Sequence, residues 1–581
     1  MKQIFLPLFL LMAAPLSVVA QKLTDVNKAV VRLVTFNTAG DTLQTSNAYF
    51  CSANADIVAP FQAFRGAARA EITDSKGKRA EVLRIAGASN AFDIVKATTN
   101  AETKKLVFLT TAPQPATAAT DVFHQAFYST EKKSLPLTAN ILSRHQADGY
   151  SYYDLSTPNE AQYVGCPVIN AEGKVVCVMQ KSILKEKPLA FGVDARAADS
   201  LKISSTSIFN IDLNEILIPK LVPTATEQEA FSYIYMVLRS KASAANKLTA
   251  IADFQKAFPK NNEIIGEIAT YHASQNEFQR ADQVLTEAIA KGLPNAADLC
   301  QLRSDLILDK VSRAETSVYP AWNLEAALAA AKQGASLSNA PKHLLQEGVV
   351  LLSMNRNREA YDCFQKFNAT PEANAQSYTH AATALTRDKG DKQQVVALLD
   401  SAVNLAGENS QAALAPLLAR AIALAEMEEY RRAVLDLVAY EKIATPGTLN
   451  DYFYFIRSQM ERNTRMYQQA LNDLDKAIAL AQNAESRANY LTERTQLYLQ
   501  VGMFEEAGES AKQILAIDPD NMYGHRFLGI ALGEQGQKAQ ALQALKRAQQ
   551  LGDEVVPSLL EKYQKLAATP EKRTTAPRKR K

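Results

Sequence analysis

Small residues recur at a nearly constant interval through the C-terminal two thirds of the chain. Counted back from the C-terminal end, they are Ala541, Ala507, Ala470, Ala433, Val395 and Ala360, separated by 34, 37, 37, 38 and 35 residues. A period of this length is typical of repeat proteins, in which each repeat is one supersecondary unit. The surrounding sequence is rich in Ala, Leu, Glu and Gln with helical periodicity, so each repeat is predicted to be a helix pair that stacks on the next.

The unit at residues 488–521 shows the pattern most clearly. Its first helix has small or apolar positions, GMFEEA follows at 502–507, and a second helix ends at Asp518-Pro519. This resembles the tetratricopeptide repeat, with its small residue at position 8, glycine at 15, alanines at 20 and 27, and proline at 32. An aromatic residue at position 17 recurs as Phe504, Tyr467, Tyr430 and Phe278. The resemblance implies an all-α solenoid over residues 227–566, with about nine helix pairs, one of them expanded at 297–341, and a capping helix at 558–566.

An array of this kind has no chemistry of its own, and the resemblance implies binding of a protein or peptide partner in a groove lined by the first helices. The groove-facing positions in the last three units are expected to be Tyr452, Phe455, Gln459, Asn489, Thr492, Gln496, Tyr523 and Arg526. Aromatic, amide and guanidinium groups suit an extended peptide. The alternative for Tyr452 and Phe455 is packing between helices. Cys300, Cys363 and Trp322 are expected to be buried apolar residues.

Residues 23–205 have a different pattern, in which short runs rich in β-branched and aromatic residues alternate with turn signals. Runs at 29–37, 46–53, 56–60, 70–73 and 79–85 predict strands, and DSKGK at 74–78 predicts a tight turn. Many short strands without long helical periods favour a barrel or a sandwich. Residues 206–226 are predicted to link this region to the helices.

Four segments of this region resemble trypsin-like serine proteases, in the same order. The segment at 48–72 is similar to the one that carries the catalytic histidine, and NAFDIVK at 90–96 is similar to the one that carries the aspartate. YVGCPVINAEGKVVCVM at 163–179 is similar to the segment that carries the serine, and LAFGV at 189–193 is similar to the closing strand. The resemblance implies an all-β double barrel.

The same resemblance implies that catalysis has been lost. Gln62 stands at the histidine position and Val164 at the serine position, so Asp93 alone remains of the triad. A carboxamide cannot accept the proton of a nucleophile, and an isopropyl group cannot attack a carbonyl carbon. The region is therefore predicted to be a pseudoprotease.

Two interpretations of Cys166 stay open. As a nucleophile it would make the chain an active peptidase, with His124 or His145 as the base, although relatives of the fold that use cysteine place it at the serine position. In the other interpretation, a hairpin loop at 170–173 places Cys166 opposite Cys177, within reach of a disulfide. The chain has five cysteines, so at least one is unpaired, and Cys51 would be the odd thiol of this region.

The two ends of the chain differ from the rest in composition. Lys2, the apolar run at 4–14 and Val-Val-Ala at 18–20 predict a signal peptide over residues 1–20, and hence a periplasmic or secreted protein of the bacterial cell envelope. Residues 567–581 are predicted to be a disordered basic tail that either touches anionic surfaces or only solubilises the protein. Six basic residues and one acid at 571–581 contribute +5, so the rest of the chain carries 3 − 5 = −2.

These charges make nucleic-acid binding an improbable function. Past residue 20 the sequence contains no transmembrane run, and its cysteines and histidines lack zinc spacing, so no metal or cofactor is expected. The leading hypothesis is an exported, non-catalytic scaffold that binds a partner through its repeats. The alternatives are an active peptidase that uses Cys166, and a barrel that holds peptide ends without cleaving them.

Overall fold

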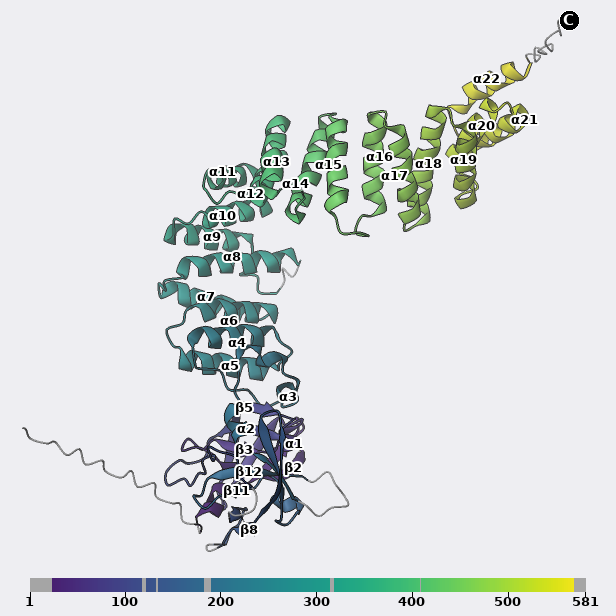
Figure 1. Ribbon diagram of the computed structural model, residues 1–581. Helices are drawn as coiled ribbons and strands as arrows, with labels where there is room; N and C mark the ends of the chain where they lie inside the picture. Colours follow the sequence, from purple (N-terminus) through teal and green to yellow (C-terminus); the bar gives the residue numbers. More distant parts are fainter. Residues whose placement is uncertain are drawn as a thin grey trace, which may run out of the picture. The chain divides into compact units, whose positions relative to one another are not determined.

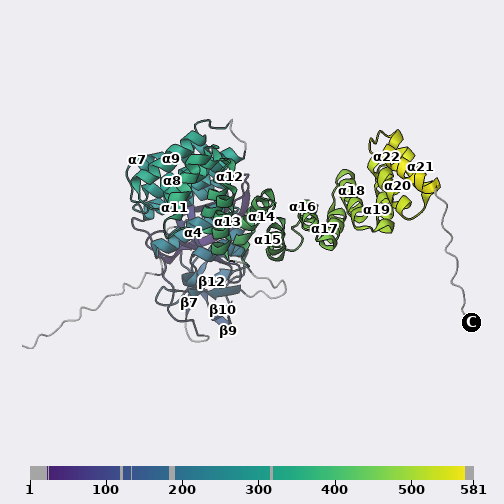
Figure 2. The ribbon, with the colours of Figure 1, turned by 90° about the horizontal axis from the view of Figure 1, so that it is seen from above.

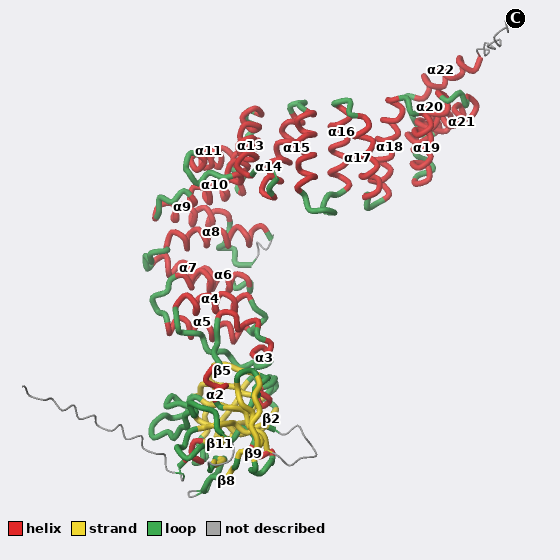
Figure 3. Tube along the Cα trace, viewed as in Figure 1, coloured by secondary structure: helices red, strands yellow, loops and turns green. Residues whose placement is uncertain are grey.

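The computed structural model describes residues 23, 25–117, 122–131, 134–181, 190–313, 318–407 and 409–568. The expected signal peptide and most of the expected basic tail lie outside these residues. The chain divides into two compact units, Met1–Val284 and Leu285–Lys581, which are described separately (Figure 1). Among the described residues, all strands belong to the first unit, and helix pairs follow them (Figure 3).

A closed barrel of six antiparallel strands occupies residues 30–99, all of which the structure describes. Its strand order is β1-β2-β3-β6-β5-β4. The strands are β1 (Val30–Phe36), β2 (Thr42–Phe50), β3 (Ile57–Ala59), β4 (Arg69–Thr73), β5 (Arg79–Ser89) and β6 (Ile94–Thr99). They overlap all five strand runs predicted in this part of the sequence. The short helix α1 (Phe61–Phe64) leaves the barrel directly after β3.

The second barrel of the resemblance is an open sheet of seven strands within the described part of residues 123–194, in the order β8-β7-β11-β12-β13-β10-β9. Its strands are β7 (Phe123–Gln125), β8 (Leu137–Ala139), β9 (Ile141–Ala147), β10 (Tyr150–Leu155), β11 (Pro167–Ile169), β12 (Val175–Gln180) and β13 (Ala190–Asp194). A separate apolar core, which includes Val168, Val178 and Val193, lies against this sheet. The predicted fold class, an all-β region followed by an all-α helical array, is confirmed, although only the first of the two expected barrels is closed.

Residues 206–226, the expected linker, are folded onto the barrel. They include α3 (Ile211–Asn214) and a stretch that extends the edge of β5, where the Ile85 N–H donates to the Pro219 carbonyl at 2.9 Å and the Leu221 N–H donates to the Ile85 carbonyl at 2.8 Å. The Lys220 ammonium donates to the carbonyls of Ile216 and Ile218 at 2.5 and 2.7 Å. Burial lowers the pKa of Lys220 to about 8.

The first helices complete the core of the barrel. These helices are α4 (Glu227–Arg239), α5 (Ala244–Ala257) and α6 (Glu263–Ser274). Their side chains Tyr233, Ile234 and Phe254 belong to the same apolar cluster as Leu33 and Phe50 of the barrel. The guanidinium of Arg84 on β5 also holds the carboxylate of Asp253 on α5, at 2.5 and 3.0 Å. The compact unit therefore ends at Val284, and not near residue 226 as the sequence pattern predicted.

The remaining helices continue as antiparallel pairs. They are α7 (Phe278–Ala290), α8 (Ala296–Ser312), α9 (Leu324–Leu337), α10 (Lys342–Ser353), α11 (Asn357–Asn368), α12 (Ala375–Arg387), α13 (Lys392–Ala406), α14 (Leu414–Glu426), α15 (Tyr430–Ile443), α16 (Asp451–Asn463), α17 (Tyr467–Leu480), α18 (Ala484–Val501), α19 (Phe504–Ile517), α20 (Met522–Glu534), α21 (Lys538–Gln550) and α22 (Val556–Ala568). Over the described residues, α4 to α21 make nine pairs and α22 follows alone. From α14 onward each pair contacts the next (Figure 2).

The periodic small residues lie where the helices of a pair meet. Ala360, Ala433, Ala470, Ala507 and Ala541 are all 0% exposed. Asparagine side chains start several first helices by accepting a backbone N–H, as Asn450 does from Phe453 at 3.0 Å and Asn521 from Gly524 at 2.9 Å. Cys300, Cys363 and Trp322 are buried, as expected. No helix in the described part of the chain is both long and apolar enough to span a membrane.

Candidate functional site

The residues at the histidine and aspartate positions lie next to each other. Gln62 is on α1, and its backbone N–H donates to the Asp93 carboxylate at 2.9 Å. The side chain of Gln62 points elsewhere, because its amide donates to the Asn90 side chain at 2.9 Å. Burial raises the pKa of Asp93 above its usual value, while the N–H of Gln62 favours the charged form. Asp93 therefore binds main chain where a triad aspartate would orient an imidazole.

The residue at the serine position is held by main-chain bonds. Val164 follows a short 3₁₀ turn, Ala161–Tyr163, and its N–H donates to the Ala161 carbonyl at 3.3 Å. Its carbonyl accepts from the backbone N–H and the side chain of Asn47, at 3.2 and 2.9 Å. In the Ser-His-Asp mechanism the N–H of the nucleophile helps to bind the developing oxyanion. At Val164 that N–H already has a partner.

Gly165 brings this turn against the first barrel. Its φ is +85°, and a Cβ placed on it would lie 2.2 Å from the Asn47 carbonyl oxygen and 2.8 Å from Cδ of Pro60. Only glycine fits this approach without moving backbone. The positions of Gln62, Asp93 and Val164 are thus brought into one neighbourhood, as the resemblance implies.

The predicted pairing of Cys166 with Cys177 is wrong. The turn after β11 is one residue shorter than expected, since the Asn170 N–H donates to the Lys174 carbonyl and Asn170 takes the place expected for Ile169. A bulge between Val168 and Ile169 adds a second offset. Cys177 consequently lies opposite Val168. Both cysteines are free thiols. A Cβ on Gly192 of β13 would lie 2.6 Å from Sγ of Cys177, so that thiol packs against the glycine.

The groups considered for cysteine catalysis are not arranged for it. Cys166 is 0% exposed, and burial raises the pKa of its thiol well above the usual value. His124 lies opposite Ile169 in the sheet. The imidazole of His145 contacts Ser143 and Asp154, at 3.0 and 3.1 Å, through the same atom, Nε2. A base that works between serine and aspartate needs both ring nitrogens, so this exposed cluster lacks the geometry of a triad.

The predicted groove residues on the last units are partly available and partly engaged. Tyr452, Asn489, Gln496 and Tyr523 are exposed, and Gln459 is half-buried. Phe455 packs on Tyr490 with ring centroids 4.9 Å apart, which is the packing alternative. The Thr492 hydroxyl donates to the Ala488 carbonyl at 2.8 Å. Arg526 binds the buried carboxylate of Asp553 at 3.0 Å and stacks over Tyr523.

A cavity of about 730 Å³ lies between α14 and α16 and contains one of the predicted residues, Tyr452. We call it the apolar cavity; its lining includes Leu418, Ile422, Tyr440, Tyr452, Phe453 and Ile456. A second cavity of about 510 Å³, the basic cavity, lies between α12, α13 and α14, and its lining includes Arg387, Lys389, Lys392, Val395, Ile422 and Glu426. The sequence pattern did not single out α12 or α14, whose groove-facing positions follow from the same register as Tyr452.

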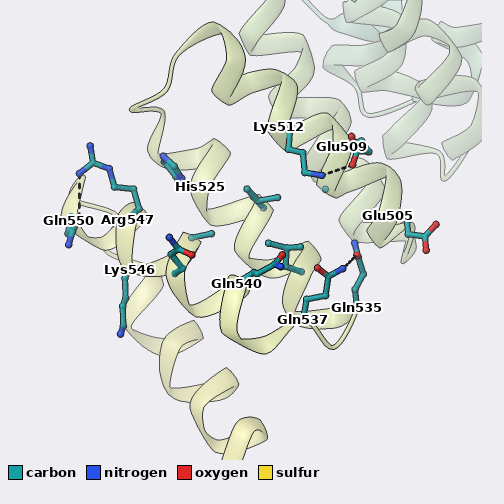
Figure 4. A pocket seen from close by; sticks show the side chains of 15 residues that line it. Glu505, Glu509, Lys512, His525, Gln535, Gln537, Gln540, Lys546, Arg547 and Gln550 are labelled. Atoms are coloured by element: carbon teal, nitrogen blue, oxygen red, sulfur yellow. Dashed lines mark hydrogen bonds and ion pairs between the residues drawn. The ribbon is translucent and has the colours of Figure 1, made fainter.

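The largest of the described cavities, about 1080 Å³, lies between α19, α20 and α21. Five glutamines and five charged side chains line it, with Gln535, Gln537 and Gln540 close to one another (Figure 4). Its charged groups are partly paired within the site, as Lys512 is with Glu509 at 2.7 Å. None of the three cavities is lined by Gln62, Asp93 or Val164.

Three arginines, of which one is buried and two are partly buried, connect successive helix pairs, and sequence reasoning missed them. Arg420, Arg457 and Arg494 are 37 residues apart, each on the first helix of its pair. Arg457 holds Asp473 of its own pair with two bonds, at 2.5 and 2.9 Å, and Glu441 of the preceding pair at 2.7 Å. Arg420 binds Asp436 and Asp400 in the same way. The signal was present, because the arginines have the spacing of the alanines.

Arg494 varies this arrangement. It binds Asp475 of the preceding pair at 2.6 Å, but in its own pair it binds the neutral side chains Ser510 and Gln513, at 3.2 and 2.7 Å. Within the described residues, no three His, Cys, Asp or Glu side chains are placed to share a metal ion.

Comparisons with known proteins give matches to solved structures only. No protein-family model matches the chain, and no curated protein matches it. A TPR protein described as having an unusual peptide-binding site, YrrB, is 17% identical over 35% of this chain and 99% of its own, with a TM-score of 0.29. The serine endoprotease from Yersinia pestis is 14% identical over 30% of this chain and 61% of its own, with a TM-score of 0.25. The Rv3671c protease from M. tuberculosis is 15% identical over 32% of this chain and 85% of its own, with a TM-score of 0.27.

Proposed function

We propose that this protein is a non-catalytic scaffold whose helical array binds an extended segment of a protein partner. The apolar cavity carries the proposal. Leu418, Ile422 and Tyr452 are exposed on its rim, although each would gain about 25 cal/mol for every Å² removed from water. An exposed apolar hollow between first helices is the kind of surface that accepts a partner's side chain.

Three features of the barrel support its assignment as a pseudoprotease. Gln62 and Val164 lack the base and the nucleophile of the triad. The N–H of Val164 is bonded within its own turn. Cys166, the alternative nucleophile, is buried. Each step of acyl transfer would therefore need a group that this neighbourhood lacks.

The cell envelope is the proposed location, and the composition of residues 1–20 supports it. Export would place both the array and its partner outside the cytoplasm. Sequencing of the mature N-terminus checks this part of the proposal: a chain that begins at Gln21 supports export, and a chain that retains residues 1–20 contradicts it.

Capture from envelope extracts tests the binding function. The immobilised protein is compared with Ile422→Ser, which places a hydroxyl in the apolar cavity, and with Leu435→Ser as the matched control. Leu435 is more exposed than Ile422 but lines neither the apolar nor the basic cavity. Partners retained by the wild type and Leu435→Ser but lost from Ile422→Ser support the proposal. Equal capture by all three proteins contradicts it.

Activity-based labelling tests the loss of catalysis. Fluorophosphonate and iodoacetamide probes are expected to leave the folded barrel unlabelled at the triad positions and at Cys166. Labelling of Cys166 in the folded protein, together with peptide cleavage that Cys166→Ala abolishes, would establish the peptidase alternative instead.

A further inference from the structure

The apolar and the basic cavity adjoin along α14. Ile422 and Glu426 line both of them, so a ligand in one lies beside the same two side chains as a ligand in the other. All the lining residues lie on the consecutive helices α12 to α16 of the second unit or in the loops that join them. An extended chain that follows the first helices can therefore enter both cavities.

The two cavities differ in what they offer. On the rim of the apolar cavity, Leu418, Ile422 and Tyr452 are 38%, 50% and 59% exposed, and the aromatic ring of Phe453 completes its wall. Burial of a large apolar side chain of a ligand is favourable there. A charged side chain in the same place would lose its hydration, and the one charged group of the lining, Glu426, is already paired with Lys392.

The basic cavity has an excess of positive charge. Its cations are Arg387, Lys389 and Lys392, and its one carboxylate is Glu426. Glu426 is already used, because Lys392 lies 3.4 Å from it. Among the described residues, Arg387 and Lys389 make no ion pair with a carboxylate; the guanidinium of Arg387 only reaches the Leu352 carbonyl, at 3.5 Å. Two cations are thus left to meet a negatively charged group.

From this juxtaposition we infer that the array recognises an acidic, apolar-anchored peptide: a large apolar side chain enters the apolar cavity, and neighbouring Asp or Glu side chains bind Arg387 and Lys389. The inference rests on the proposed function and specifies the chemistry of its partner. The chain's own C-terminal segment, EKRTTAPRKRK, has the opposite charge and is disfavoured as the occupant.

Defined peptides test the inference directly. The probes are two fluorescein-labelled decapeptides, each with one phenylalanine and three neighbouring aspartates. The aspartates precede the phenylalanine in one probe and follow it in the other. Binding to the full-length protein is followed by fluorescence anisotropy. Replacing the aspartates by lysines, or the phenylalanine by serine, is expected to weaken binding at least about tenfold. Raising the salt concentration should weaken only the acidic probe.

Two variants divide the site. Arg387→Gln combined with Lys389→Gln should weaken the acidic probe about tenfold and remove most of its salt dependence. Ile422→Ser should weaken every probe that contains phenylalanine. Matched controls are Lys366→Gln and Leu435→Ser, both exposed residues of the array outside the two cavities.

The outcomes separate this inference from the function on which it rests. If envelope partners and phenylalanine probes bind but acidic and basic probes bind equally, the acidic specificity is wrong and the scaffold function stands. If no probe binds and no partner is captured, both fail. If Ile422→Ser instead dissolves a homodimer measured by light scattering, the occupant is a second copy of the chain and the inference is overturned.

Discussion

At Gly165 a single missing side chain determines how closely two β layers approach. The residue was expected to be only one of several matching positions in residues 163–179, yet its Cα lies against the Asn47 carbonyl and Pro60. Sequence similarity assigned Gln62, Asp93 and Val164 to the triad positions, and this assignment stays a prediction. The same similarity did not predict the partner of Cys177, because one bulge and a turn one residue shorter than expected moved the register by two positions.

Gly165→Ala is expected to destabilise the first unit by about 3 kcal/mol or more, since the strain of a positive φ adds to a clash with backbone. Gly149→Ala is the matched control. It has a φ of +79° and nothing within 4 Å of the new Cβ, so it should cost only about 1 kcal/mol. Chemical denaturation followed by circular dichroism measures the free energy of unfolding of both variants. Equal losses of stability would refute the close approach of Gly165 to Asn47 and Pro60.

Glu461 makes the second unit sensitive to pH. Burial, followed by the charge of Asp473, raises its pKa to about 7, although Arg457 opposes this shift. Between its ordinary value of 4.5 and about 7, the folded carboxyl keeps a proton that the unfolded chain has lost. The free energy of unfolding therefore falls as the pH rises through this window.

Glu461→Gln should remove this dependence, which is on the order of 2–3 kcal/mol. Urea denaturation of the wild type and the variant at pH 5 and pH 8 provides the comparison. The expected result is that the variant loses less stability than the wild type between the two pH values. Identical losses would show that other groups cause the dependence.

At the scale of helices, small residues pack the two helices of a pair together, and the arginines of α14, α16 and α18 bind carboxylates of the preceding pairs. The positions of the alanines were predictable because a periodic small residue has one physical role, close helix packing. The arginines have the same period, but a charged residue on a helix is usually exposed, and only the fold shows Arg457 buried between two carboxylates.

Arg420→Met should cost about 3–5 kcal/mol around α14 and α15, because it leaves the carboxylate of Asp436 buried without its partner. Arg432→Met is the control, since the pair of Arg432 with Glu429 is about half exposed and is worth about 1 kcal/mol or less. Hydrogen exchange of α13 to α15 resolves the local effect, which a global unfolding curve of a repeat array does not.

Adding Asp436→Leu to Arg420→Met is expected to restore much of the lost protection, because the uncompensated charge is removed. Failure of the double variant to recover would mean that the arginine acts through its packing rather than its charge.

At the scale of the whole chain, the change of sequence texture near residue 226 does not mark the edge of a folded unit. The local amino-acid composition reflects the type of secondary structure, so it changes where the strands end and the helices begin. The core does not end there, because Tyr233, Ile234 and Phe254 fill space that the barrel leaves open. Contacts between distant segments determine such a boundary, and a single sequence does not display them.

A fragment of residues 23–292, which ends after α7, should therefore be markedly more stable than a fragment of residues 23–226. The shorter fragment exposes the apolar residues that α4 to α6 cover. Thermal denaturation and limited proteolysis of the two fragments measure the difference. A fully cooperative, equally stable short fragment would show that the barrel core closes without the helices.

The shared core also sets an order of events during synthesis. Strands β1 to β6 emerge first, whether from the ribosome or from an export channel, but their core stays open until α4, α5 and α6 have followed. The later helix pairs need only their neighbours and can form as they appear. The barrel therefore cannot complete its core until residue 271 has emerged. During that interval its apolar residues are most exposed to chaperones and to aggregation.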